Sequence, residues 1–273
     1  MQRVSRMVKH LGFQAIAAVF LLAGPAAAQN LNLEGGKDGA PVEVFADNGI
    51  EWQQDGQIFI ARGNARAVRG DMVVRAEELR AYYRADDAGS TQIWRLDALG
   101  SVKITSAEET VFGDKGIYDL DNSILVMTGK NLKLVTPTQE LTARDSLEYW
   151  IAKEMAVARG DALAINADKR VKADVLTALF KKDKSGKSSA RQINAFGNVV
   201  IATKQDIVKA DKAVYNVRSG IARMSGAVEM TRGKNKLNGC SAEVNMNTQV
   251  SKLFACKKSS DGRVKGTITP QQR

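Results

Sequence analysis

The sequence predicts an all-β protein whose short strands repeat along the chain, as in a jelly roll, a sandwich or a solenoid. Three observations support this fold class. A glycine-led motif recurs at similar intervals, apolar and polar residues alternate inside its copies, and turn-forming residues separate the copies. The 273 residues are enough for one large domain or two small ones.

The N-terminal segment has the features of a cleaved export signal. Three basic residues precede an uncharged stretch at residues 11–24, and Pro25-Ala26-Ala27-Ala28 provides an A-x-A end. A retained membrane anchor is the alternative, but a spanning helix needs about 20 apolar residues. We therefore expect residues 1–28 to be removed on export to an oxidising compartment. Residues 29–41 then form a polar N-terminal segment.

The composition argues against an enzyme and against a metal site. His10 is the only histidine and lies in the export signal, so the mature chain lacks the imidazole of Ser-His-Asp triads, Cys-His pairs and many zinc sites. Two cysteines cannot form a four-cysteine metal site. The acidic residues are spread at the repeat interval, as solvated turn residues are. We therefore predict no catalytic residue, no metal and no cofactor, and carboxylates on one face of a β-solenoid enzyme remain the open alternative.

The repeat starts with a glycine and a polar residue, followed by alternating apolar residues. Its copies start at Gly63, Gly100, Gly129, Gly160, Gly197 and Gly226. The spacings are 37, 29, 31, 37 and 29 residues, so glycines three copies apart are separated by 97 residues, which suggests a threefold super-repeat. The longer copies contain polar inserts at residues 84–91 and 181–190, which we expect to be loops.

Each copy continues with an apolar residue, then a small residue and usually an acid, as in Val111-Phe112-Gly113-Asp114. Small residues at this position fit a place where the sheet turns or where two sheets approach closely. One stretch, residues 74–84, is rich in good helix formers. It aligns with the strand halves of the other copies, so we expect a strand there as well.

Aliphatic residues alternate with polar ones inside the repeat, which predicts strands with one apolar face. If two such sheets close fully, the interior is a core. If they splay, it is an apolar slot with unpaired strand edges at both ends. The inward, lipid-binding candidates are Val102, Ile104, Leu132, Leu134, Val199, Ile201, Val228 and Met230.

Cys240 and Cys256 both lie eight residues from Thr248, in a segment typical of a hairpin. A hairpin symmetric about Thr248 places the cysteines directly opposite one another, within reach of a disulfide. Closing a loop of this size contributes about 3 kcal/mol in the chain-entropy description. A functional thiol pair is the alternative, but the sequence has no CxxC spacing and no histidine nearby.

Without the three basic residues of the export signal, 37 lysines and arginines face 30 acids, which leaves a net charge of +7. This excess is either an ordinary basic surface or a means of attracting an anionic partner. For an exported protein, a glycolipid or a membrane surface fits better than nucleic acid, because aromatic residues, at 6% of the chain, are too few to stack single strands. Lysines and arginines at the rim of an apolar slot would suit the phosphates of a head group.

The repeated units resemble those of the LptA/OstA family of lipopolysaccharide (LPS) transport proteins. The resemblance is carried by AFGNVVI at residues 195–201, ADKAVYN at 210–216, GAVEM at 226–230 and LNGCSAEVN at 237–245. It implies an elongated, twisted β-jelly roll of antiparallel strands over residues 42–256, followed by a basic, polar tail at 257–273. It also implies a periplasmic protein that carries LPS and has no catalytic residue.

Within this family, a cleaved signal and a short tail favour the soluble bridge. The resemblance then implies head-to-tail self-association through the terminal strands, with an LptC-like partner at the inner membrane and an LptD-like partner at the outer membrane. Burying an acyl chain is worth about 0.8 kcal/mol per CH₂, so a continuous aliphatic trough lets a lipid move with little change in burial. A polysaccharide-active β-solenoid enzyme and a periplasmic scaffold without ligand are the competing interpretations.

Overall fold

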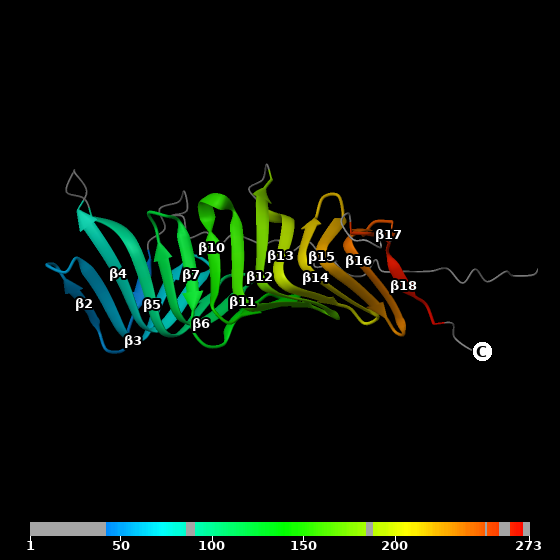
Figure 1. Cartoon of the computed structure of the whole chain (residues 1–273). Helices are drawn as coiled ribbons and strands as arrows, with labels where there is room; N and C mark the ends of the chain where they lie inside the picture. The colour runs from blue at the N-terminus through cyan, green and yellow to red at the C-terminus, as the bar shows by residue number, and fades with distance from the viewer. Residues whose placement is uncertain (1–41, 86–90, 184–187, 249, 257–262, 270–273) are drawn as a thin grey trace, which may run out of the picture.

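The computed structural model describes residues 42–85, 91–183, 188–248, 250–256 and 263–269. Regular structure in these ranges is β-strand, apart from one turn of 3₁₀ helix, η1 (Ile151–Lys153). The strands form a single 18-stranded sheet, and its pairings are antiparallel. The expected all-β fold, an elongated and twisted jelly roll, is therefore confirmed (Figure 1).

The strands differ in length, from three residues in β1 and β18 to 15 residues in β5 and β13. They are β1 (Glu43–Phe45), β2 (Ile50–Gln53), β3 (Ile58–Arg69), β4 (Met72–Ala85), β5 (Thr91–Thr105), β6 (Thr110–Asp119), β7 (Ile124–Thr128), β8 (Leu132–Val135), β9 (Gln139–Ala143), β10 (Ser146–Trp150), β11 (Met155–Asn166), β12 (Lys169–Lys182), β13 (Ser188–Ala202), β14 (Asp206–Asn216), β15 (Ile221–Arg232), β16 (Asn235–Asn245), β17 (Val250–Phe254) and β18 (Lys265–Thr267).

Consecutive long strands pair with one another, so the sheet is a meander. β3 to β6 and β11 to β16 follow one another as hairpins. Between these blocks, β7 and β8 share one place in the sheet, as β9 and β10 share the next. β6 pairs with both members of the first pair, and β11 with both members of the second. The ends are built alike, by β1 and β2 on β3 and by β17 and β18 on β16.

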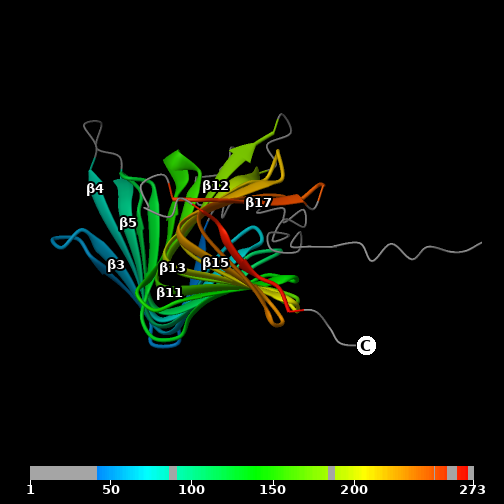
Figure 2. The same cartoon turned by 45° about the vertical axis from the view of Figure 1, so that its right-hand side comes forward.

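The sheet is folded lengthwise along one line, which gives it a V-shaped cross-section (Figure 2). We call its two sides the first arm, which includes β2, β7, β10 and β17, and the second arm, which includes β1, β8, β9 and β18. The long strands cross the fold line and belong to both arms. Register shifts mark each crossing, for example between Arg159 and Ala162 in β11 and between Phe196 and Val199 in β13. An extra residue at such a bulge bends the strand.

The repeated glycines lie on this fold line and explain the repeat. Gly197 has a φ of 73° and Asn198 a φ of 47°, and the other copies are similar except at Gly129, which has a φ of 123° and is followed by a positive φ only at Asn131. A Cβ atom on Gly197 would lie 2.1 Å from Oδ2 of Asp174, the acid of the small-plus-acid motif on the neighbouring strand. Gly226 and Asp211 repeat this contact at 2.0 Å. The two halves of the sequence motif therefore meet across adjacent strands, and a side chain at the glycine would displace the acid.

The stretch with helical propensity is a strand, as expected. Residues 74–84 lie within β4, which pairs with β3 and β5 along its length. Tertiary pairing therefore overrides the local preference of its Ala, Glu, Leu and Arg residues. The two polar inserts fall at the β4–β5 and β12–β13 hairpins, and the strands extend into both: β4 ends at Ala85 and β5 starts at Thr91, while β12 ends at Lys182 and β13 starts at Ser188. The expected loops at 84–91 and 181–190 are therefore too long, and the hairpin tips, residues 86–90 and 184–187, lie outside the described residues.

The proposed export signal, residues 1–28, and the polar segment, residues 29–41, also lie outside the described residues. At the other end, part of the expected polar tail is structured, because β18 pairs with β16 through Lys265–Thr267. Across the described ranges, no helix has the length and apolarity needed to cross a membrane.

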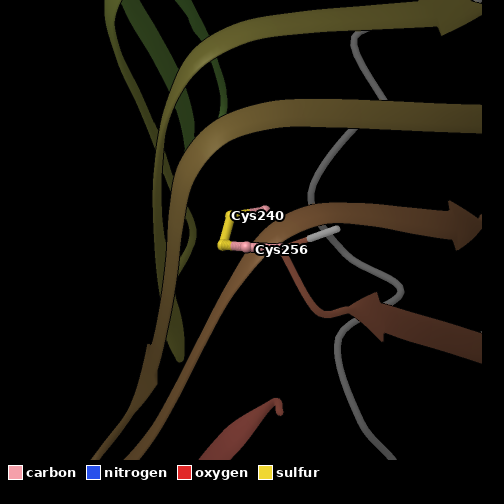
Figure 3. Close-up of a disulfide and its surroundings, with 2 residues drawn as sticks. All are labelled: Cys240 and Cys256. Carbon is pink, nitrogen blue, oxygen red and sulfur yellow. A yellow bond between two sulfur atoms is a disulfide. The ribbon is translucent and has the colours of Figure 1, made fainter. Parts of the chain in front are cut away.

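A disulfide joins Cys240 and Cys256 at the C-terminal end of the sheet (Figure 3). The hairpin register differs from the expected one by one residue. Ser241 pairs with Phe254 and Asn245 with Val250, so the hairpin is not centred on Thr248 and the cysteines are not direct cross-strand partners. Cys256 lies beyond Phe254, the last residue of β17 that pairs with β16. The Cα atoms still approach to 5.0 Å, inside the usual disulfide range.

Candidate functional site

The inner face of the second arm is built from rows of side chains that run across its strands. In the row next to the fold line, a larger aliphatic residue faces a small one on the next strand, as in Val102 with Gly113 and Val199 with Ala210. This pairing lets the two arms approach closely near the fold line.

The second inner row is aliphatic from β4 to β16, without a polar residue. Each member is the register partner of the next: Val74, Ile104, Val111, Leu134, Leu141, Ala164, Val171, Ile201, Val208, Met230 and Leu237. The row crosses the join between β8 and β9 without a break. It therefore gives the second arm one continuous apolar band along the long axis of the molecule.

The eight inward candidates lie together in these two rows. Val102, Leu132, Val199 and Val228 belong to the row at the fold line, and Ile104, Leu134, Ile201 and Met230 belong to the second row. All of them pack in one hydrophobic cluster with residues of the first arm. Leu134 is half-buried, and the other seven are at most 4% exposed. In this structure the candidates fill a closed core near the fold line, so they are inward residues but not the walls of an open slot.

Four apolar residues that were not among the predicted candidates also retain exposure on the inside of the arms. Leu141 in the second arm, and Leu120, Val217 and Met246 in the first, are half-buried like Leu134 and pack on the edge of the cluster. Those of the first arm lie beside hairpin turns, where the alternating pattern ends and sequence alone does not assign a face.

The first arm ends in an apolar inner rim. We define the apolar rim as Tyr83, Leu120, Ile151, Phe180, Val217 and Met246. Aromatic contacts extend it: the Tyr149 and Phe180 rings are 6.3 Å apart, and Trp52 donates a hydrogen bond of 2.7 Å from Nε1 to the Tyr83 hydroxyl. Phe59 lies between these last two rings, 5.2 Å from one and 5.0 Å from the other.

The second arm ends in a polar inner rim. Its members lie two residues beyond the aliphatic row, or beyond Ala67 on β3, and therefore on the same face. β4 is the exception, because the residue at this position is Met72, the register partner of Arg69. We define the polar rim as Arg69, Ser106, Glu109, Thr136, Gln139, Asn166, Lys169, Thr203, Asp206, Arg232 and Asn235. All are half-buried except Asp206, which is 3% exposed. The acids among them were predicted to be solvated turn residues, because turn composition does not say which way a side chain points.

Two carboxylates of the polar rim have different surroundings. Asp206 accepts two hydrogen bonds from Arg232, 2.6 Å from Nε and 2.7 Å from Nη2, so this buried charge is compensated. Burial raises the pKa of Glu109 to about 7, and the neighbouring charge of Glu108 adds to the effect. Glu109 is therefore partly protonated at neutral pH.

The outer face of the first arm carries conventional ion pairs. Arg159 donates to Glu148 at 2.6 Å, and Arg62 bridges Glu51 and Glu78. Burial opposes ionisation of Glu148, but hydrogen bonds from Arg159, Trp150 and Ser146 lower its pKa. These contacts stabilise the surface of the sheet and do not form a reactive site.

No group of three His, Cys, Asp or Glu residues suited to a metal is found among the residues described. The acids at the fold line lie on separate strands, and each contacts the glycine turn of a neighbouring strand. For example, Asp114 Oδ2 accepts a hydrogen bond of 2.7 Å from the Lys130 backbone N–H. What the arrangement offers chemically is an elongated interior with one apolar rim and one polar rim.

Comparison with known proteins identifies relatives of this architecture. The sequence model of a family described as "LptA/(LptD N-terminal domain) LPS transport protein" matches residues 43–145 and 140–250. An uncharacterized protein of Rhizobium meliloti (strain 1021) is 26% identical over 98 residues, which are 34% of this chain and 52% of that protein. The match therefore spans about half the length of this curated relative.

A solved structure is also similar to part of the chain. It is LptH of Pseudomonas aeruginosa, described as the LptA homologous periplasmic component of the conserved lipopolysaccharide transport device. The two are 17% identical with a TM-score of 0.41, and the match covers 48% of this chain and 95% of that one.

Proposed function

Since the chain belongs to the LptA/(LptD N-terminal domain) family of LPS transport proteins, we propose that its folded sheet carries LPS across the periplasm as a soluble bridge. The observation that supports this most directly is the unbroken aliphatic row from Val74 to Leu237. The row is closed in this structure, and once the arms separate it would offer an acyl chain the same surroundings at successive positions along the molecule. A lipid then moves from strand to strand without leaving an apolar environment.

Binding requires the two arms to separate at their rims. The residues near the fold line are closed, so acyl chains enter over the half-buried positions such as Leu134, Leu141, Leu120 and Val217. Burial of a chain of about ten carbons is worth roughly 8 kcal/mol. That gain exceeds the loss of contact between a few half-buried side chains, each worth at most about 1.5–3 kcal/mol when fully buried.

The ends of the sheet support head-to-tail assembly. β1 and β2 at one end, and β17 and β18 at the other, are strands of three to five residues with mostly exposed side chains. Edge strands pair readily with another chain. On this proposal, the same edges join one copy to the next, to an LptC-like protein at the inner membrane and to an LptD-like protein at the outer membrane.

The protein contributes no energy to the transfer on this proposal. Its role is to keep acyl chains out of water while a partner ATPase drives movement. Residues 1–28 supply the signal that delivers the chain to the periplasm. No side chain takes part in a covalent step, which agrees with the structural use of the acids at the fold line.

Photo-crosslinking with matched positions tests the proposal. A benzophenone side chain placed at Leu134 or Leu141 faces inward, whereas at the adjacent Lys133 or Thr142 it faces outward on the same strand. We expect LPS adducts from the inward pair and none from the outward pair in cells that make LPS. Equal labelling at both faces, or no lipid in native mass spectra of the purified protein, would refute LPS carriage.

A further inference from the structure

The unlike rims of the two arms give an amphiphile one favoured orientation. Resting on the function proposed above, we propose that the phosphorylated sugar head group of the carried glycolipid lies along the polar rim of the second arm, while its acyl chains lie toward the apolar rim. Arg69 on β3 and Lys169 on β12 bind the head group at two separate positions along the sheet, because seven strand pairings lie between them.

The chemistry of the two rims supports this orientation. The apolar rim presents half-buried side chains such as Leu120, Val217 and Met246. From β5 to β16, the polar rim presents hydroxyl, amide and charged groups on successive strands, directly beyond the aliphatic row. An acyl chain on the aliphatic row therefore places its head group within reach of the polar rim, whereas the opposite orientation would leave phosphates against hydrocarbon. Desolvating an unpaired charge against hydrocarbon is strongly unfavourable.

The cations of the polar rim are also available. Within the part of the chain that the structure describes, the side chains of Arg69 and Lys169 make no ion pair, although both are half-buried on the inner face. Arg232 differs, because it is held by Asp206. Half-buried cations without partners gain charge-assisted hydrogen bonds from a phosphate. Of the cations in the polar rim, Arg232 therefore belongs to a structural ion pair, whereas Arg69 and Lys169 can bind a ligand.

Glu109 belongs to the same rim and fits the same ligand. Its side chain has no hydrogen-bond partner among the described residues, and burial favours its protonated form. A protonated carboxyl donates a hydrogen bond to a phosphate or sugar oxygen, whereas an ionised one would repel the phosphate.

The orientation is tested with a variant that lacks the two inward cations and a control that lacks two outward cations. Arg69→Gln/Lys169→Gln removes two inward charges. The control, Arg66→Gln/Arg170→Gln, removes two charges from the same strands, β3 and β12, but from the outer face. The probes are phosphorylated lipid A and the same lipid after its phosphates have been removed. Melting temperatures of all variants establish that each is folded.

We expect the inward variant to bind phosphorylated lipid A at least about tenfold more weakly than the parent, since a hydrogen bond to a charged group is worth about 1.5–3 kcal/mol. Its affinity for dephosphorylated lipid A should be unchanged, and the control variant should bind both lipids as the parent does. Unchanged binding of the phosphorylated lipid, an equal loss for both lipids, or an equal loss in the control overturns the orientation.

A second measurement keeps the orientation separate from LPS carriage itself. A benzophenone at Asn166 in the polar rim should label the sugar, and one at Val217 in the apolar rim should label an acyl chain. Labelling of acyl chains at both positions, with LPS adducts retained at Leu141, would refute the orientation and leave carriage intact. Loss of every adduct would refute both.

Discussion

Replacing Ile201 by Asp should destabilise the protein far more than the same change at the adjacent Val200. Ile201 is 1% exposed and lies between Val171 and Val208 in the aliphatic row. Losing a buried aliphatic side chain costs about 2–5 kcal/mol. The new carboxyl adds about 1.4 kcal/mol at neutral pH for each unit by which burial raises its pKa. The sum, at least about 5 kcal/mol, is comparable with the whole stability of many domains.

Val200 is the matched control because its side chain points to the other face. Its register partners are Lys172 and Lys209, so an Asp at this position gains cations on both sides. Exposed ion pairs contribute about 0.2–1 kcal/mol each, which offsets the loss of a half-buried valine. We therefore expect Val200→Asp to change the free energy of unfolding by less than about 1 kcal/mol.

Urea denaturation followed by far-UV circular dichroism measures both variants. The folded-state pKa of the new Asp at position 201 lies above its unfolded-state value, so its charge penalty is full at pH 7.5 and disappears below the unfolded pKa of about 4. The difference between the two midpoints should therefore shrink at pH 4. Equal midpoints at pH 7.5 would show that Ile201 does not face the core. LPS adducts from Leu141 should be lost in Ile201→Asp and kept in Val200→Asp.

Three further changes test other parts of the structure. Glu109→Gln should raise the free energy of unfolding at pH 8 by up to about 3 kcal/mol and leave it unchanged at pH 4. The reason is that a folded-state pKa of about 7 makes the stability of the parent fall as pH rises from 4.5 through 7. A gain that is the same at both pH values contradicts the raised pKa of Glu109. Gly197→Ala should cost about 1–3 kcal/mol by thermal melting, and less in an Asp174→Ala background, where the contact of 2.1 Å is gone; additive losses would argue against that contact. Cys240→Ser/Cys256→Ser should cost about 3 kcal/mol, and a melting curve identical to that of the parent would show that the disulfide does not constrain the unfolded chain.

The sequence was sufficient to predict which residues face inward, because alternation with a period of two assigns a side chain to a face. Val199, Ile201, Val228 and Met230 are inward for this reason. Alternation carries no information on the distance to the opposite arm. The closed packing near the fold line therefore appears only when the side chains of the first arm are placed beside those of the second.

Other features were beyond the sequence for different reasons. The partnership of Gly197 with Asp174 joins residues on neighbouring strands, so a repeat detected along one chain shows both halves but not their contact. The polar rim, including Glu109, lies at hairpins, where composition predicts a turn but not a direction. The cysteine register was wrong by one residue because a hairpin centred on a residue and one centred on a bond have nearly the same spacing.

The lengthwise fold gives a carrier two properties at once. Each long strand crosses both arms, so each added hairpin lengthens the core, the aliphatic row and both rims together. The two ends remain short edge strands at any length, because no strand needs to return along the molecule to close it. A sheet built this way can be extended by repeats of 29 to 37 residues without changing its cross-section. On the function proposed here, the lipid would meet the same surroundings at every repeat, and the number of repeats would set only the distance that one molecule spans.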